Sequence, residues 1–265
     1  MGISRGDLPI IPSVEATLTS QMESYLNQDL FFLVIQLIVN FQTGCVSIGE
    51  ALARLNHPEQ GVISADGFVP TLNAIGLHSK FDLYIFQKCC NWLQRTTAEE
   101  KRFACLFCNF SRKTLSQPGI HRELRRIADS YGIPPYKLGI EITEWEPATD
   151  LQQITENLRR LKAAGFRIIL DDYGSGVTAE SDLNHFPLDI VKLDHSLLGN
   201  TNTAQGSTAF RTLVKTLTRQ GVQVVCEGIE TEAQDILARE AGCHYGQGFL
   251  YGRPVCQDRV LELTR

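Results

Sequence analysis

Strand-like and helix-like segments alternate along most of this chain, and few folds accommodate such an alternation. Short apolar runs typical of buried strands lie near residues 30–39, 45–53, 103–109, 138–143, 166–171, 190–193, 223–227 and 248–251. Helical patterns separate most of them, at about 65–75, 80–94, 118–131, 149–164, 178–185, 206–220 and 232–241, and a terminal helix is expected at 256–264. This order indicates parallel strands joined by right-handed crossovers.

About eight strands in roughly 250 residues predict an α/β fold of the (β/α)8 type, and a doubly wound open sheet is the structural alternative. The turn Gln42-Thr43-Gly44 joins the first two strands, which could therefore form a hairpin. One strand of that hairpin must run antiparallel to the others. We therefore expect a modified, TIM-like barrel with an antiparallel first strand.

Residues 1–27 are expected to form a lead-in with a short amphipathic helix, and residues 28–265 the main domain. Ser13 is the expected N-cap, and Val14, Leu18 and Met22 share one helical stripe that ends near Asn27. Stripes of this spacing usually pack on the body of a protein. The alternative is a contact surface for a partner or an upstream domain.

Charge and apolar runs exclude some classes of partner. The net charge of -5 argues against a nucleic acid polymer, but it leaves room for a small anionic ligand held by metal ions. The longest apolar run, residues 30–39, is too short to span a bilayer, and no secretory leader is visible, so no membrane role is expected.

The eight cysteines lie mostly inside apolar runs, as buried reduced cysteines do. Cys105 and Cys108 have a spacing that suggests a metal site, but residues three apart in a strand point to opposite faces. We therefore expect core thiols and a reducing compartment, the cytoplasm. The six histidines show no ligand spacing and are interpreted as surface or packing residues.

Polar side chains stand at the carboxyl end of nearly every predicted strand. In a barrel these ends converge on one mouth, where active sites lie. Several carboxylates in one pocket cannot all ionise without cations, and oxygen-only ligands favour Mg²⁺ or Mn²⁺ over zinc. The strand-end residues are Glu50, Asn109, Glu141, Asp171, Asp172, Lys192, Asp194, Glu227 and Gln247.

The adjacent carboxylates Asp171 and Asp172 could serve two ions, with Asp171 bridging both and Asp172 bound to one of them. The alternative is that the strand simply ends in an ordinary turn, because Asp and Gly are common turn residues. Lys192 suits the attacking water or a phosphate oxygen, or it could instead neutralise Asp194. Arg54 could hold phosphate with its planar guanidinium.

A set of motifs in the same order resembles the EAL family of cyclic di-GMP phosphodiesterases over about residues 28–256. The matching segments are Glu50-Ala51-Leu52 with Arg54, Asn109-Phe110-Ser111, Glu141-Ile142-Thr143-Glu144, Asp171-Asp172-Tyr173-Gly174-Ser175-Gly176, Val191-Lys192-Leu193-Asp194, Glu227-Gly228-Ile229-Glu230-Thr231 and Gln247-Gly248-Phe249-Leu250-Tyr251-Gly252-Arg253-Pro254.

The resemblance implies a barrel with an antiparallel first strand that hydrolyses cyclic di-GMP to linear pGpG with two Mg²⁺ or Mn²⁺ ions, and that Ca²⁺ inhibits. The implied metal ligands are Glu50, Asn109, Glu141, Asp171, Asp172 and Glu227. Implied catalytic residues are Lys192 at the water, Glu50, and Glu227 as ligand or base. The side chains implied to face the substrate are Gln36, Leu52, Arg54, Asp194, Glu230 and Gln247.

Two segments depart from the family pattern. Many active members continue the loop after the paired aspartates with Tyr-Ser-Ser, where this chain has Val177-Thr178-Ala179-Glu180, and the strand-one Gln-Pro-Ile is Gln36-Leu37-Ile38. Glu144 is implied to brace the loop after the paired aspartates, although Glu144 and Glu230 could equally be loop caps.

The alternative function is a catalytically weak or inactive member that acts as a cyclic di-GMP receptor or as a regulator that binds a protein partner. Family members often form homodimers, so a homodimer is also expected.

Overall fold

The computed structural model describes residues 12–98, 103–142, 150–175, 180–199, 201 and 203–263. Eight strands close a barrel in the order β1-β9-β8-β7-β6-β5-β4-β2, and β2 pairs again with β1. Their bounds are β1 Phe31–Asn40, β2 Val46–His57, β4 Cys105–Phe110, β5 Leu138–Ile142, β6 Arg167–Tyr173, β7 Ile190–Leu193, β8 Gln223–Cys226 and β9 Tyr245–Gly246.

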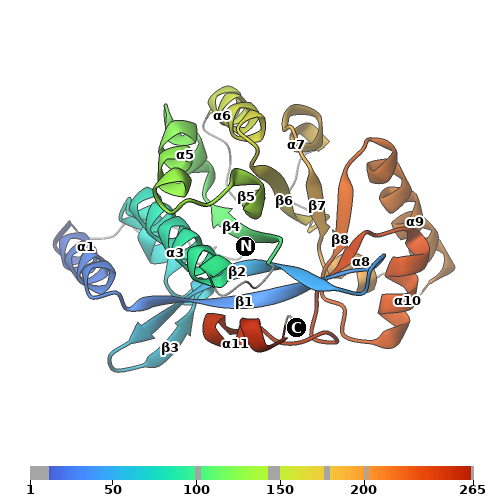
Figure 1. The fold of residues 1–265 in the computed structure, drawn as a ribbon, viewed down its shortest axis with the longest axis horizontal. Helices are drawn as coiled ribbons and strands as arrows, with labels where there is room; N and C mark the ends of the chain where they lie inside the picture. Colours follow the sequence, from blue (N-terminus) through green and yellow to red (C-terminus); the bar gives the residue numbers. More distant parts are fainter. Residues whose placement is uncertain are drawn as a thin grey trace, which may run out of the picture.

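Strand β1 runs antiparallel to both of its barrel neighbours, β2 and β9, and the other neighbouring barrel strands pair in parallel. The prediction of a modified barrel that begins with a hairpin is therefore confirmed. Figure 1 shows this hairpin as the longest pair of strands. Two short strands extend the sheet outside the ring, β3 Gly61–Ser64 beside β2 and β10 Val255–Cys256 beside β1.

Helices surround the barrel, as the alternating pattern predicts (Figure 1). The helix bounds are α1 Pro12–Asn27, α2 Val69–Ala74, α3 His78–Ala98, α4 Arg112–Leu115, α5 Ile120–Ser130, α6 Leu151–Ala163, α7 Glu180–His185, α8 Ser196–Gly199, α9 Ala204–Arg219, α10 Glu232–Ala241 and α11 Gln257–Leu263. Two 3-10 turns lie at Ala65–Gly67 and Pro135–Lys137. None of the helices in the described ranges has both the length and the apolarity needed to cross a membrane.

The N-terminal helix α1 packs its carboxyl-terminal half on the body of the protein. Met22, Tyr25 and Leu26 are buried in the main core, whereas Val14 is exposed. The expectation of Ser13 as N-cap is wrong, because Ser13 lies inside α1.

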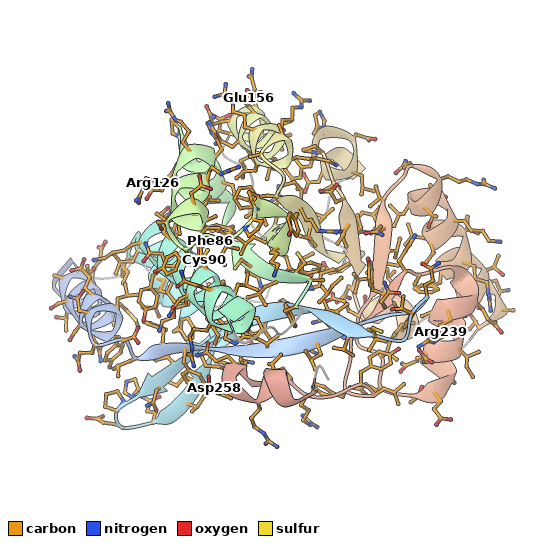
Figure 2. The ribbon with its side chains drawn as sticks, viewed as in Figure 1. Phe86, Cys90, Arg126, Glu156, Arg239 and Asp258 are labelled. Atoms are coloured by element: carbon orange, nitrogen blue, oxygen red, sulfur yellow. The ribbon has the colours of Figure 1, made fainter. Side chains whose placement is uncertain are left out.

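The core between the strands and the outer helices is apolar. Figure 2 places Phe86 and Cys90 on α3, and both side chains are fully buried. By contrast, the charged residues labelled in that figure lie on the outer helices; they are Arg126, Glu156, Arg239 and Asp258.

A second apolar cluster fills the inside of the barrel and forms what we call the barrel floor. Its members are Ile38, Ile48, Cys105, Phe107, Ile169, Ile190, Val225 and Tyr245. Cys105 points into this floor, whereas Cys108 lies in the core outside the barrel, as expected for residues three apart in a strand. All eight cysteines lie within the described ranges and are free.

The last barrel strand was predicted at residues 248–251 and instead spans Tyr245–Gly246. Phe249 and Leu250 are exposed, so the apolar run that suggested a strand lies on the surface. The true strand is defined by its pairing with β8 and β1. Tyr245 on this strand is also part of the barrel floor. Strand β3 was likewise not predicted from the sequence.

Gly139 on β5 provides the space that the floor needs. A Cβ atom at this position would lie 2.6 Å from Ile169 Cδ1 and 2.6 Å from Phe107 Cδ1. We expect Gly139→Ala to lower the free energy of unfolding by about 1–3 kcal/mol, the usual cost of overpacking a core. Urea unfolding measures this loss. In the control Gly199→Ala the new methyl meets open space, so an equal loss there would contradict the explanation.

Candidate functional site

The candidate site lies directly above the barrel floor. The two-residue repeat of the strands determines which side chains point into it. Because alternate residues of a strand share a face, the side chains that lie one inward position nearer the carboxyl ends of the parallel strands than the floor point into the barrel mouth. Around the barrel from β2 to β9 the residues at this level are Glu50, Asn109, Glu141, Asp171, Lys192, Glu227 and Gln247, of which Glu227 and Gln247 directly follow β8 and β9, and Gln36 lies opposite Glu50 on the antiparallel β1. The sequence prediction that strand ends meet at one mouth therefore has a structural basis.

Lys192 lies at the centre of this layer, with 1% of its side chain exposed. Its Nζ atom is 3.0 Å from Glu50 Oε2, 2.5 Å from Glu141 Oε1, and 2.8 Å from both Asp171 Oδ1 and Glu227 Oε1. Burial alone would lower the pKa of this ammonium group, but the four carboxylates outweigh burial and raise the pKa well above its usual value. These contacts favour the protonated, positively charged form of Lys192.

The alternative in which Lys192 mainly neutralises Asp194 does not describe this arrangement. Asp194 accepts hydrogen bonds from the Ser196 backbone N–H at 3.0 Å and pairs with His195 Nδ1 at 2.9 Å. Burial raises the pKa of Asp194, but the bonds from Ser196 and His195 outweigh it and lower the pKa overall. These contacts favour the ionised form of Asp194, directly after β7.

Glu50 is the most extensively hydrogen-bonded carboxylate of the site. Besides Lys192, it accepts hydrogen bonds from Asn109 Nδ2 at 3.0 Å and from Gln247 Nε2 at 2.9 Å. Burial raises its pKa, but Lys192, Gln247 and Asn109 together lower the pKa below its usual value. Glu50 is therefore held ionised and in one orientation.

In the other carboxylates of this layer, the surroundings disfavour the ionised form. Burial is the largest cause that raises the pKa of Glu141, Asp171 and Glu227, and neighbouring carboxylates add to the rise. Burial, and then Asp171, raises the pKa of Asp172 to about 6. These groups therefore favour additional positive charge beside them.

Asp171 and Asp172 reach the same site because the backbone of β6 is irregular. Neighbouring residues in a regular strand point to opposite faces. Here one extra residue bulges out of the pairing with β7 between Leu170 and Tyr173, and Asp172 has a positive φ of 54°. Aspartate is among the residues that tolerate this conformation best, and it turns the second carboxylate back towards the first.

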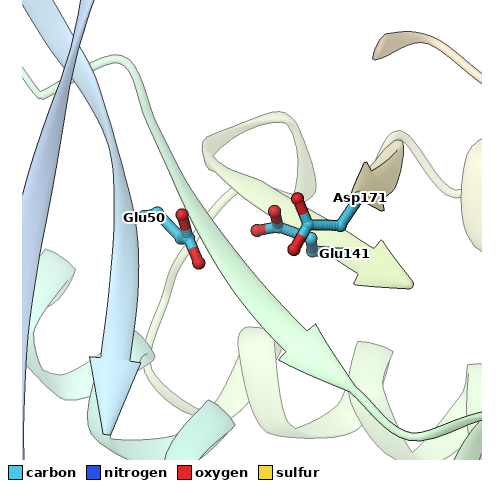
Figure 3. A group of neighbouring side chains, drawn as sticks. All are labelled: Glu50, Glu141 and Asp171. Carbon is cyan, nitrogen blue, oxygen red and sulfur yellow. The ribbon is translucent and has the colours of Figure 1, made fainter. Parts of the chain in front are cut away.

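Two groups of carboxylates are close enough to hold cations. Oxygen atoms of Glu50, Glu141 and Asp171 lie within 4.8 Å of one another, and so do those of Asp171, Asp172 and Glu227. Figure 3 shows the carboxylates of the first group facing a common space. Asp171 belongs to both groups, as expected for a residue that bridges two ions.

The donor set fits divalent cations that prefer oxygen ligands. The two groups contain five carboxylates, and Lys192 supplies one positive charge, so two divalent cations would neutralise the fully ionised set. Within the described ranges, Glu141 Oε2 and Gln247 Oε1 are buried side-chain oxygens without a hydrogen-bond partner. Buried acceptors of this kind need a partner such as a cation.

A cavity of about 650 Å³ opens beside the acidic layer. Leu52, Asn109 and Asp172 line this cavity, and helices α2 and α3 supply apolar side chains to its wall. Sequence analysis did not assign the cavity residues Asp66, Asn73, His78 and Asp82 to the site, and no spacing signal in the sequence marks them.

The structure gives the surroundings of three of the remaining predicted residues. Gln36 pairs with Glu50 across the first hairpin, and Arg54, half-buried on β2, donates to the Ala53 carbonyl at 2.8 Å. Glu230 is exposed just before α10, and Thr231, not Glu230, caps that helix. Glu144 and the segment 177–179 lie outside the described residues.

The sequence profile of the EAL domain matches residues 19–254. The chain belongs to the EAL family. An uncharacterized signaling protein of Caulobacter vibrioides is 34% identical to this EAL domain over 236 residues, which cover 86% of this chain and 29% of that protein. The cyclic di-GMP phosphodiesterase NbdA of Pseudomonas aeruginosa is 28% identical, with 95% of this chain and 33% of that protein covered. The chain thus spans about a third of the length of these relatives.

The fold of this EAL domain also matches solved EAL structures. The EAL enzyme Bd1971, in its form with bound cAMP and cyclic-di-GMP, superposes with a TM-score of 0.86 at 21% identity, covering 95% of this chain and 69% of that chain. At this identity the likeness establishes the TIM-like barrel.

Proposed function

We propose that this EAL domain hydrolyses one phosphodiester bond of cyclic di-GMP to give linear pGpG, with two Mg²⁺ or Mn²⁺ ions. The observation that carries this proposal is the pair of carboxylate groups that share Asp171 above a closed barrel floor. We assign the metal ligands to Glu50, Asn109, Glu141, Asp171, Asp172 and Glu227. When bound, two such ions activate a water molecule and stabilise the leaving oxygen of a phosphodiester.

The protein's own residues orient the reacting groups. Lys192 stays protonated, so its ammonium group can donate hydrogen bonds to the attacking water or to a phosphate oxygen. Glu227 lies beside it and can accept a proton from that water if it does not serve only as a ligand. The buried carboxylates of Glu50, Glu141 and Asp171 contact Lys192 and keep its ammonium group in place.

The cavity suits a nucleotide substrate. A volume of about 650 Å³ lies in the usual range for small-molecule sites, and its apolar wall can hold a flat base. Leu52 lines this cavity. We assign Gln36, Arg54, Asp194, Glu230 and Gln247 to the surrounding substrate contacts, with Arg54 on phosphate because its guanidinium group matches phosphate oxygens.

The metal requirement gives the direct test. Purified protein incubated with cyclic di-GMP should form linear pGpG with Mg²⁺ or Mn²⁺, and EDTA or excess Ca²⁺ should abolish product formation, as measured by chromatography. Absence of product with both activating ions would overturn the proposal. Binding of cyclic di-GMP without turnover would instead favour the receptor function, in which a regulatory protein partner would read the bound state.

We also propose a homodimer, as is frequent in the family, and a cytoplasmic location. The eight free cysteines support a reducing compartment. Light scattering of the purified protein measures the oligomeric state.

A further inference from the structure

A short helix follows the candidate ligand Asn109 almost at once and is fixed from the α3 side. Helix α4 begins after its N-cap Ser111, whose hydroxyl accepts from the Thr114 backbone N–H at 3.2 Å. Asp82 on α3 accepts three hydrogen bonds from this turn through one oxygen, two from Ser111 at 3.0 and 2.9 Å and one from Thr114 at 2.5 Å. The carboxyl end of β4 is thus tied to α3.

The same helix is fixed on its other side by a buried ion pair. Arg112 donates to both carboxylate oxygens of Asp182 on α7, and Nη1 lies 3.4 Å from Oδ1. Only 6% and 3% of the two side chains are exposed, and the guanidinium group lies 5.6 Å from the centre of the Phe186 ring. The pair joins positions 70 residues apart in the sequence.

Helix α7 is the first described helix after β6, the strand that carries Asp171 and Asp172. We propose that the Arg112–Asp182 ion pair holds the carboxyl ends of β4 and β6 at a fixed separation, and so positions the metal-binding oxygens that these strands carry. Neither residue touches the site, so both are positioning residues. The inference rests on the proposed function only in taking the strand-end oxygens as metal ligands.

Because the ion pair is buried, it can fix the position of α4 relative to α7. A charge buried without its partner is strongly unfavourable, so loss of either residue forces helix α4 or α7 to shift until the remaining charge reaches water. Strand β5 lies between β4 and β6 and pairs with both strands along most of its length. The shift should therefore appear at the strand ends, not in the barrel floor.

Two measurements on Arg112→Met test the inference. The Kd of Mn²⁺, titrated by electron paramagnetic resonance, should rise about tenfold, as is typical when a group that supports metal ligands is lost. In the metal-free protein, hydrogen exchange should accelerate at the strand ends, residues 109–111 and 171–175, and remain unchanged at β8, residues 223–226. Arg125→Met is the matched control, because it removes an exposed ion pair with Asp129 and should change neither quantity.

Asp182→Asn provides a second variant with the same shape and one remaining hydrogen-bond acceptor for Arg112. This variant should show the same changes in the Kd of Mn²⁺ and in hydrogen exchange. The double variant should lose less Mn²⁺ binding free energy than the sum of the two single variants, because the two residues act together. Uniformly faster exchange, including β8, would mean a merely structural role and overturn the inference, as would unchanged exchange at both strand ends. If the unaltered protein binds no Mn²⁺, the proposed function fails, yet the exchange data still decide this inference.

Discussion

Replacing Glu50 by glutamine is expected to lower the turnover of cyclic di-GMP by about 1,000-fold, which corresponds to about 4 kcal/mol of transition-state stabilisation. Glu50 belongs to the first carboxylate group and is held ionised by Lys192, Asn109 and Gln247. The amide has nearly the same shape, so the variant removes one charge and little packing. The measured quantity is the rate of pGpG formation with saturating Mn²⁺.

The expected loss belongs to the site and not to the fold. A cooperative thermal transition should accompany it, because the single carbonyl oxygen of glutamine can still accept the hydrogen bond from Lys192, and only the oxygen that accepts from Asn109 is replaced by an amide nitrogen. Glu156→Gln, which alters an exposed carboxylate on α6, serves as the control and should retain full activity. A Glu50→Gln or Glu50→Ala variant with the original rate would refute the assigned metal centre.

Lys192→Met is expected to abolish turnover and to destabilise the metal-free protein by about 3–5 kcal/mol, the typical cost of a buried charge cluster that loses its partner. Four carboxylates depend on this ammonium group, and three of them have a raised pKa even in its presence. Mn²⁺ should restore most of the lost stability, because a divalent cation can replace the missing positive charge.

The measurement is urea unfolding of the Lys192→Met variant with EDTA and with Mn²⁺, beside the activity assay. Lys80→Met removes an exposed ion pair with Glu23, and such pairs contribute about 0–1 kcal/mol, so this control should unfold like the unaltered protein. Equal stability of Lys192→Met with and without metal would contradict the view that cations complete the charge balance of the site.

Much of the fold could be predicted from the sequence because strands and helices alternate with clear punctuation. The barrel and its opening hairpin were expected, and β1 indeed runs antiparallel to both neighbours. The last strand was misplaced because Phe249 and Leu250 look like strand residues. The two-residue strand β9 is defined by its partners β8 and β1, and local sequence carries little information about such pairing.

The candidate site was predictable in its composition but not in its geometry. Polar strand ends must meet at a barrel mouth, so the gathering of acids around Lys192 follows from the topology. The bulge that turns Asp172 towards Asp171 does not, because strict alternation would have separated the two carboxylates. Arg112 and Asp182 were also missed, since nothing near either residue in the sequence indicates a buried partner so far along the chain.

Within the described residues, the barrel floor closes the barrel below the candidate site. Its residues are almost completely buried, and Tyr245, Phe107 and Ile169 fill the space that a second exit would need. Under the proposed function, metal ions and substrate enter from the mouth, so the ions that bind deepest in the site have to arrive before a dinucleotide covers them. The depth of the site thus imposes an order in which metal ions and substrate bind.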